Sequence, residues 1–302
     1  MKKYIYTLSF IFIIVGCQSN DEFIFELKSS TDTNINFENN LTFDQKFNVY
    51  TYRNFYNGGG VSIGDINNDG LADIYFTANQ KLNELYLNKG NLKFENISDT
   101  AGIGGKRAWS TGVTMVDINA DGLLDIYICN SGDVEGDNKQ NELYINQGDL
   151  TFSEEAEKYG LADPGYSTHA SFFDYDKDGD LDVYLLNNSY QAIGSFDLRR
   201  NERPKRDTDG GDKLLQNQNG KFVDVSEKSG IFGSVIGFGL GVTVGDVNSD
   251  GWEDIYVSND FFERDYLYIN NQDGTFSEKL TDAISSLSAA SMGADMADIN
   301  ND

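Results

Sequence analysis

The stretch Asp65-Ile66-Asn67-Asn68-Asp69-Gly70-Leu71-Ala72-Asp73 decides the fold, because the chain of 302 residues repeats its pattern. Each copy has Asp at positions 1, 5 and 9, Asn or Asp at position 3, and Gly at position 6. Further complete copies begin at Asp117, Asp174 and Asp246, and a fifth begins at Asp298 and reaches the end of the chain. Successive copies start 52, 57, 72 and 52 residues apart. Self-similarity at such a period is typical of propellers, solenoids and repeat arrays.

The segments around each copy distinguish between these architectures. An apolar run precedes each copy, a β-rich run follows it, and a second hairpin pattern ends in Phe. These segments are 60–64, 74–77 and 85–94 in the first repeat, 112–116, 126–129 and 143–152 in the second, 170–173, 183–186 and 214–222 in the third, and 241–245, 255–258 and 267–276 in the fourth. Gly, Asn and Asp turns suit hairpins, and no window has a sustained 3.6-residue apolar period. The sequence therefore predicts an all-β fold, a β-propeller of four-stranded blades, with about five blades in this chain.

The acidic stretches have the chemistry of calcium sites. Side-chain oxygens at positions 1, 3 and 5, the backbone carbonyl at position 7 and Asp at position 9 give about six hard oxygen ligands, which suit Ca²⁺. We expect about one Ca²⁺ per complete repeat, coupled to folding because converging carboxylates repel one another. The predicted ligands are Asp65, Asn67, Asp69, Leu71 and Asp73; Asp117, Asn119, Asp121, Leu123 and Asp125; Asp174, Asp176, Asp178, Asp180 and Asp182; Asp246, Asn248, Asp250, Trp252 and Asp254; and Asp298, Asn300 and Asp302.

Other interpretations of these stretches fit less well. An EF-hand needs a bidentate Glu at position 12, where this chain has the apolar residues Phe76, Ile128, Leu185 and Val257. Dockerin-like or thrombospondin-like arrays pack their loops closely, without a long strand pattern between them. A single copy is compatible with an ordinary Asx-rich turn, but four copies with one nine-position spacing favour metal binding.

Further strings carry a family resemblance. They are Tyr56-Asn57-Gly58-Gly59-Gly60-Val61-Ser62-Ile63-Gly64-Asp65, Glu84-Leu85-Tyr86-Leu87-Asn88-Lys89-Gly90 and Asn259-Asp260-Phe261-Phe262. With the acidic stretches, they resemble the FG-GAP/VCBS repeats of integrin-α-type β-propellers, and 23–302 resembles the N-terminal part of bacterial VCBS repeat proteins of the CRTAC/ASPIC–UnbV type. The resemblance implies a seven-bladed propeller, often followed by another domain, and therefore an N-terminal fragment of a longer protein. A short chain with a broken last repeat is the alternative.

The N-terminus has the pattern of a lipoprotein signal peptide. A positive start and a mostly apolar run precede Ile14-Val15-Gly16-Cys17, which resembles a bacterial lipobox. We expect residues 1–16 to be removed and Cys17 to be lipidated, which would anchor a bacterial outer-membrane lipoprotein on the periplasmic or the cell-surface side. An ordinary signal peptide with a chance Cys is the alternative. Residues 17–57 would form a tether and pre-blade strands, with strand-like stretches at 23–27 and 47–52, and 58–302 the propeller.

Composition excludes several functions. With 49 Asp and Glu against 23 Lys and Arg, the formal charge is −26, so the chain would repel nucleic acid. The one His, His169, has no nucleophile pattern beside it, and we interpret it as structural. Cys129 is expected to be a buried thiol. No catalytic constellation is present in the sequence, so we expect no enzyme activity.

The third repeat carries an insert at about 189–211, longer than the insert of the second repeat at about 131–140. Propeller inserts of this kind project from one face and often bind ligands. Tyr190 and Phe196 could stack on a sugar. The insert is a candidate docking patch for an anionic glycan or an acidic protein surface, or else a solvated loop beside an acidic rim. Its basic residues are Arg199, Arg200, Arg203, Lys205 and Arg206.

These features together predict a calcium-binding, non-catalytic module for binding or adhesion, with a protein or glycan ligand, on a bacterial envelope. Contact with the membrane would be through the lipid anchor only. One alternative is an accessory propeller domain of a larger envelope enzyme that acts on polysaccharide. Another is a structural scaffold.

Overall fold

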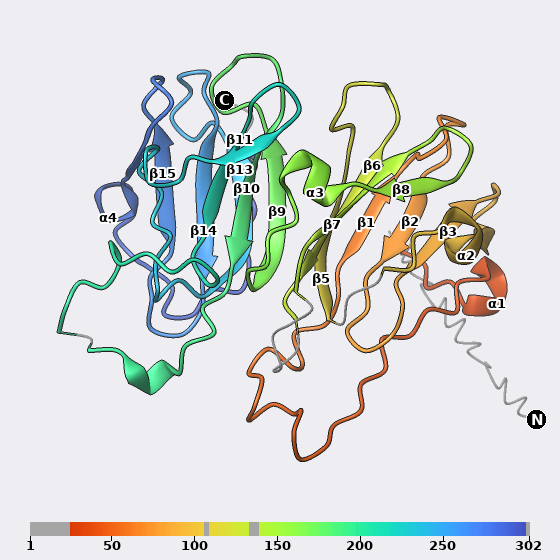
Figure 1. Cartoon of the computed structure of the whole chain (residues 1–302), viewed down its shortest axis with the longest axis horizontal. Coiled ribbons are helices and arrows are strands. Elements are labelled where there is room, and N and C mark those ends of the chain that lie inside the picture. Colours follow the sequence, from red (N-terminus) through yellow and green to blue (C-terminus); the bar gives the residue numbers. More distant parts are fainter. Residues whose placement is uncertain (1–24, 106–108, 133–138, 198, 300–302) are drawn as a thin grey trace, which may run out of the picture.

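The computed structural model describes residues 25–105, 109–132, 139–197 and 199–299, and it is an all-β propeller of four-stranded blades (Figure 1). Each blade is an antiparallel meander in chain order. The strands are β1 (Val61–Gly64), β2 (Asp73–Phe76), β3 (Glu84–Asn88) and β4 (Phe94–Asn96); β5 (Ser110–Val116), β6 (Asp125–Asn130), β7 (Glu142–Asn146) and β8 (Phe152–Glu154); β9 (Ser167–Phe173), β10 (Asp182–Asn187), β11 (Lys213–Asn217) and β12 (Phe222–Asp224); and β13 (Gly239–Gly245), β14 (Asp254–Asn259), β15 (Tyr266–Asn270) and β16 (Phe276–Glu278).

Helices are short in the described part of the chain. They are α1 (Ser30–Thr33), α2 (Ser98–Ala101), α3 (Ala156–Tyr159), the 3₁₀ turn η1 (Ile193–Ser195) and α4 (Leu280–Ala283). None of these described helices has the length and apolar character needed to cross a bilayer. The helical turns α2, α3 and α4 each follow the outermost strand of a blade, where the chain passes to the next repeat.

The core lies between successive blades. Apolar side chains from blades 1 and 2 form one cluster, those from blades 2 and 3 another, and those from blades 3 and 4 a third. Central strands such as β6 and β10 are buried along their whole length, because each is covered on both faces by a neighbouring blade. This explains why their sequences are continuously apolar rather than alternating.

The first strands of the blades lie next to one another on the inside of the propeller. The Thr111 hydroxyl donates to the Ser167 carbonyl at 2.7 Å, and the equivalent Thr168 hydroxyl donates to the Gly239 carbonyl at 3.0 Å. The fifth repeat begins in the same way. The Thr243 hydroxyl of β13 donates to the Ala294 carbonyl at 2.7 Å, so this segment occupies the place of the next inner strand although no strand is assigned there in the described residues.

The pre-blade strands expected at 23–27 and 47–52 are not found in the described residues 25–27 and 47–52, and residues 23 and 24 lie outside the described part. The described residues before β1 contain only α1 and turns. The Asp44 carboxylate accepts the N–H groups of Lys46 and Phe47, and the Tyr52 N–H donates to the Asn48 carbonyl. These local hydrogen bonds favour turns over strand pairing. The aromatic side chains here instead pack on Trp109 of blade 2.

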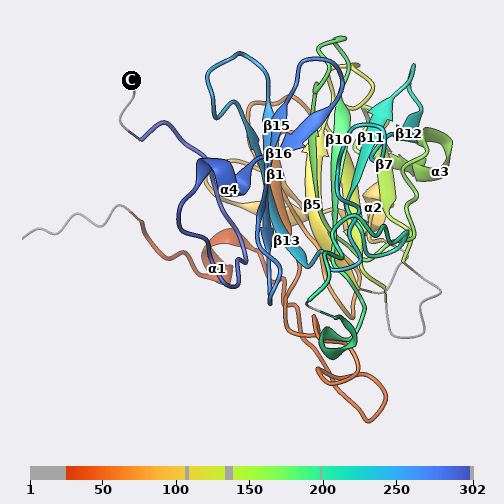
Figure 2. The same ribbon diagram turned by 90° about the vertical axis from the view of Figure 1, so that its left-hand side faces the viewer.

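The two ends of the blades differ. The acidic loops join first to second strands at one end, the top in Figure 1. The N-terminal segment and the insert between β10 and β11 lie at the opposite end, and the perpendicular view in Figure 2 agrees. The fold therefore separates the predicted metal sites from the predicted ligand loop.

Candidate metal centres

We call residues 65–73, 117–125, 174–182 and 246–254 acidic loops 1 to 4. Their backbones repeat one conformation, in which positions 4 and 6 both have positive φ. These are Asn68 and Gly70 (58° and 83°), Ala120 and Gly122 (57° and 87°), Lys177 and Gly179 (59° and 96°), and Ser249 and Gly251 (59° and 86°). Gly carries the larger φ at no steric cost, which explains why position 6 is Gly in every copy.

Side-chain oxygens hold each loop in this shape. In loop 3, Asp174 Oδ1 accepts the Asp178 N–H and Asp174 Oδ2 accepts the Gly179 N–H, both at 3.1 Å. Asp178 Oδ1 in turn accepts the N–H of Asp180 at 3.1 Å. The same pattern recurs in loops 1, 2 and 4. The loop therefore positions its carboxylates around one point by its own backbone N–H groups.

The Asp at position 9 forms the floor of each loop. These carboxylates are at most 1% exposed: Asp73, Asp125, Asp182 and Asp254. In Asp182, one oxygen accepts the N–H of Tyr175 at 3.3 Å and the other accepts the N–H of Asn217 in β11 at 2.8 Å. Burial raises the pKa of all four carboxyl groups, to about 6 for Asp125 and about 7 for Asp182.

Loop 3 fits a hard divalent cation best. Carboxylate oxygens of Asp174, Asp176 and Asp182 lie within 4.8 Å of one another. Asp176 Oδ1 and Asp180 Oδ1 are buried and have no hydrogen-bond partner among the described residues. Buried oxygens normally have a partner, and a cation of the Ca²⁺ type would supply one for this all-oxygen set.

Loops 1 and 2 have an amide at position 3. Asn67 Nδ2 donates to Asp69 Oδ2 at 3.1 Å, and Asn119 Nδ2 donates to Asp121 Oδ2 at 3.0 Å. The amides thus partly neutralise the neighbouring carboxylates, and these loops carry less concentrated negative charge than loop 3. In the fifth copy Asp298 is described, whereas Asn300 and Asp302 lie outside the described residues, as do Cys17 and the signal peptide predicted at 1–16.

Sequence reasoning missed the partners of position 9 in the third strand. These are Asn88, Asn146, Asn217 and Asn270, whose N–H groups donate to the floor carboxylates. Two of their side chains also join blades: Asn146 Nδ2 donates to the Ile66 carbonyl at 2.8 Å, and Asn270 Nδ2 to the Tyr175 carbonyl at 2.9 Å. The recurring Asn at the end of each third strand was the available signal.

Three of the five basic residues of the insert pair with carboxylates within the protein. Arg199 and Arg200 both contact the carboxylate of Asp197, at 2.8 and 3.4 Å. Arg203 forms two hydrogen bonds to Glu263, at 2.6 and 3.1 Å, and the side chain of Glu263 is 1% exposed. The pairing of Arg203 therefore ties the insert to blade 4.

Of the other side chains of the insert, some contact the protein and some are exposed to solvent. Arg206 Nη1 donates to the Ile231 carbonyl at 2.9 Å, and Lys205 is exposed. Phe196 packs in an apolar cluster with three other Phe rings, Phe238, Phe261 and Phe262. Tyr190 stacks on Tyr166 at 4.9 Å and is 47% exposed, so it is the insert aromatic that faces solvent.

Comparison with known proteins adds a family match. A family model described as the FG-GAP-like repeat matches residues 65–128, 130–185 and 246–302. The curated protein cartilage acidic protein 1 of Mus musculus is 29% identical over 205 residues, which cover 67% of this chain and 28% of the mouse protein. The Xenopus tropicalis protein is 28% identical over 207 residues, covering 68% and 29%. The chain thus spans less than a third of the length of these relatives.

A comparison with solved structures finds a lectin of Agrocybe aegerita, described as recognising non-reducing terminal N-acetylglucosamine. It is 20% identical with a TM-score of 0.38, and the alignment covers 72% of this chain and 50% of the lectin chain.

Proposed function

Because the chain belongs to the FG-GAP-like repeat family, we propose that it is a calcium-stabilised, non-catalytic propeller module that binds a protein or glycan ligand on a bacterial envelope. Loop 3 carries the calcium part of the proposal. Three carboxylates converge there within 4.8 Å, and buried oxygens of Asp176 and Asp180 lack partners in the described structure. The other loops repeat the same backbone without the carboxylates that loop 3 has at positions 3 and 7.

Calcium would supply positive charge, and the residues of this chain would supply the oxygen ligands that hold the ion. Positions 1, 3 and 5 would hold the ion from the loop, and the floor Asp would hold it from the second strand. The floor Asp already joins the loop to the third strand through its two backbone hydrogen bonds. An ion bound in the acidic loop would therefore link three strands of a blade and offset the repulsion between the carboxylates.

Ligand binding is proposed for the end opposite the acidic loops. That end carries the long insert and the N-terminal segment, and surface loops on a rigid scaffold are the usual place for recognition. The five basic residues of the insert remain a candidate contact for an acidic partner or an anionic glycan. Among them Lys205 is exposed, and Arg203 and Arg206 have contacts within the protein.

We further propose that the chain is the N-terminal part of a longer protein, anchored through lipidated Cys17. The lipobox pattern supports the anchor, and the much greater length of the relatives supports the larger protein. The same length difference favours a second candidate, an accessory domain of an envelope enzyme that acts on polysaccharide. A catalytic acid–base pair in an adjoining domain would favour that candidate over a stand-alone binding module.

The calcium proposal is tested by comparing thermal unfolding of the chain in EGTA, in millimolar Ca²⁺ and in millimolar Mg²⁺. Extracellular calcium modules bind at about 10⁻⁴ to 10⁻³ M, and an excess of about 100-fold over Kd stabilises one site by about 2.7 kcal/mol. We expect a clear rise in Tm with Ca²⁺, a smaller one with Mg²⁺, and close to one Ca²⁺ per acidic loop by metal analysis after dialysis. An unchanged Tm with no bound calcium would refute the proposal.

A further inference from the structure

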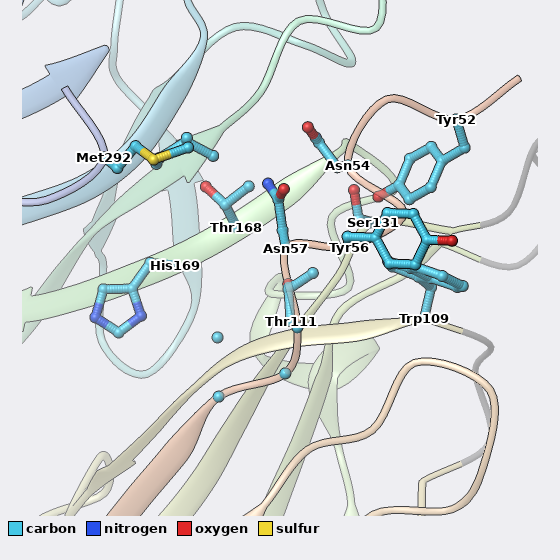
Figure 3. Close-up of a pocket in the computed structure, with 15 residues that line it drawn as sticks. Tyr52, Asn54, Tyr56, Asn57, Trp109, Thr111, Ser131, Thr168, His169 and Met292 are labelled. Carbon is cyan, nitrogen blue, oxygen red and sulfur yellow. The ribbon is translucent and has the colours of Figure 1, made fainter. Parts of the chain in front are cut away.

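We propose that the end of the propeller opposite the acidic loops contains a pocket for a neutral sugar unit. This inference rests on the proposed function as a binding module and names the class of ligand and its location. The pocket has a volume of about 480 Å³ and lies where the starts of β5 and β9 meet residues 52–60 of the N-terminal segment (Figure 3). Its volume is in the range of small-molecule sites.

The lining has the chemistry that sugars require. It offers side-chain amides from Asn54 and Asn57. The hydroxyl oxygens of Thr111 and Thr168, whose protons are donated to backbone carbonyls, remain as acceptors. Although Asp and Glu make up 49 of the 302 residues, none of the described lining residues is acidic, and none is Lys or Arg. His169 also lines the pocket, and burial lowers its pKa, so its imidazole is neutral at neutral pH. Uncharged donors and acceptors match sugar hydroxyl groups better than they match an ionic ligand.

Aromatic rings form one wall of this pocket. Figure 3 places Tyr52, Tyr56 and Trp109 on the same side. Tyr56 is 63% exposed, and its ring packs edge-to-face with Phe55 at a centroid distance of 4.9 Å. A face of the Tyr56 ring is therefore available to stack on the C–H groups of a sugar ring, as aromatic side chains do with apolar partners.

The wall is rigid and strained. Trp109 has φ of +71°, which is rare for a large side chain. Its N–H donates to the Asn79 carbonyl at 2.8 Å, its carbonyl accepts the Ser131 N–H at 3.1 Å, and its ring is packed against Tyr52 at 5.2 Å. Backbone strain that surrounding contacts maintain is concentrated at functional sites. Here the contacts of Trp109 hold the wall in place before a ligand binds.

Two buried hydroxyl groups, those of Tyr52 and Ser131, lie beside each other at this wall (Figure 3). Within the described residues, neither Tyr52 Oη nor Ser131 Oγ makes a hydrogen bond of acceptable geometry. Burial raises the pKa of Tyr52, so its hydroxyl keeps its proton and remains a donor. These two hydroxyl groups make the base of the aromatic wall polar, although both are buried.

A neighbouring pocket of about 410 Å³ provides the main competing site. It shares Tyr52 and Asn54 with the first pocket but is also lined by Lys46 and Arg53. The Arg53 guanidinium donates to the Ser189 carbonyl. This second pocket would select an anionic ligand, and the two pockets can be separated by the charge of the probe.

The test uses isothermal titration calorimetry of the calcium-treated chain with neutral oligosaccharides, namely cellotetraose, mannotetraose, xylotetraose and chitotetraose, and with tetragalacturonate as the acidic probe. We expect at least one neutral probe to bind. Tyr56→Ala should weaken that binding about tenfold, equivalent to about 1.4 kcal/mol, and Asn57→Ala should also weaken it. Tyr50→Ala is the matched control, because Tyr50 is 96% exposed and lies outside the pocket lining.

Three results would overturn the inference. They are no binding of any neutral probe at millimolar concentration, binding that is unchanged in Tyr56→Ala, and binding of tetragalacturonate alone that is lost in Lys46→Ala. Thermal unfolding of each variant with and without Ca²⁺ shows whether it folds. If calcium still raises the Tm while sugar binding fails, the pocket inference is wrong and the calcium proposal stands.

Discussion

Replacing Asp176 by Asn should stabilise the calcium-free chain and reduce the stabilisation that calcium adds. Asp176 occupies position 3 of loop 3, where the other three complete loops have Asn. The substitution therefore gives position 3 of loop 3 the residue that its neighbours have, without changing side-chain size. The Asn oxygen can still accept the hydrogen bond that Gln216 Nε2 donates to Asp176 at 2.7 Å.

The expected magnitude follows from the carboxylate spacing. Oxygens of Asp174, Asp176 and Asp182 lie within 4.8 Å of one another. Two like charges at that distance repel by about 1 kcal/mol in water and about 3.5 kcal/mol at an effective dielectric constant of about 20. Asp176 is partly exposed, so removing its charge should stabilise the calcium-free chain by about 1 to 3 kcal/mol. With calcium, the lost ligand charge should weaken binding about tenfold, or about 1.4 kcal/mol.

Differential scanning calorimetry in EGTA and in Ca²⁺ measures both effects. One kcal/mol shifts the Tm of a chain of this size by about 2 to 4 °C, so we expect a higher Tm than wild type in EGTA and a smaller gain on adding Ca²⁺. Glu227→Gln is the control, because Glu227 is exposed and lies outside the acidic loops. A Tm in EGTA that is no higher than that of the wild type, or an undiminished gain in Tm on adding Ca²⁺, would refute the reasoning.

Two further predictions concern buried carboxylates. Burial raises the pKa of Asp182 to about 7, above about 3.9 in an unfolded chain, so its contribution to stability is complete at low pH and is lost as the pH rises through 7. Without calcium, the Tm should rise when the pH is lowered from about 8 to 6. With calcium, which binds the ionised carboxylate, the Tm should instead fall over the same range. A Tm in EGTA that does not change with pH would contradict this prediction. Arg203→Ala should cost about 3 to 5 kcal/mol in urea unfolding, because it leaves the buried Glu263 unpaired. Arg199→Ala should change stability by less than about 0.5 kcal/mol, because its side chain is 89% exposed; equal losses would contradict the pairing.

The blades could be predicted from the sequence because their signals are local and repeated. The position-6 Gly, the Asp spacing and the strand pattern recur within each repeat, and the structure confirms four-stranded blades. Tyr127 illustrates the limit. A Tyr recurs at this place in every blade, but the hydroxyl partner Asn141 becomes visible only when the strands are paired.

The parts that could not be predicted depend on contacts between distant residues. Phe47 and Tyr52 have strand-like neighbours, but their true partner is Trp109, more than 50 residues away. Arg203 looked like part of a basic patch, because charge counting cannot show that it pairs with Glu263. The pocket was missed for the same reason, since its wall joins the N-terminal segment to two blades.

The threonine hydrogen bonds between inner strands also bear on how such a chain evolves. Thr114 donates to the carbonyl of Ala170, and Thr243 donates in the equivalent register to the carbonyl of Ala294. In these pairs the inner strand of one blade provides a hydroxyl donor, and the inner strand of the next blade provides a carbonyl acceptor. This arrangement is a head-to-tail interface. A duplicated gene segment encoding one blade would find a ready partner on both sides. The number of blades is then set by the angle at which successive copies turn, and not by any contact unique to one of them.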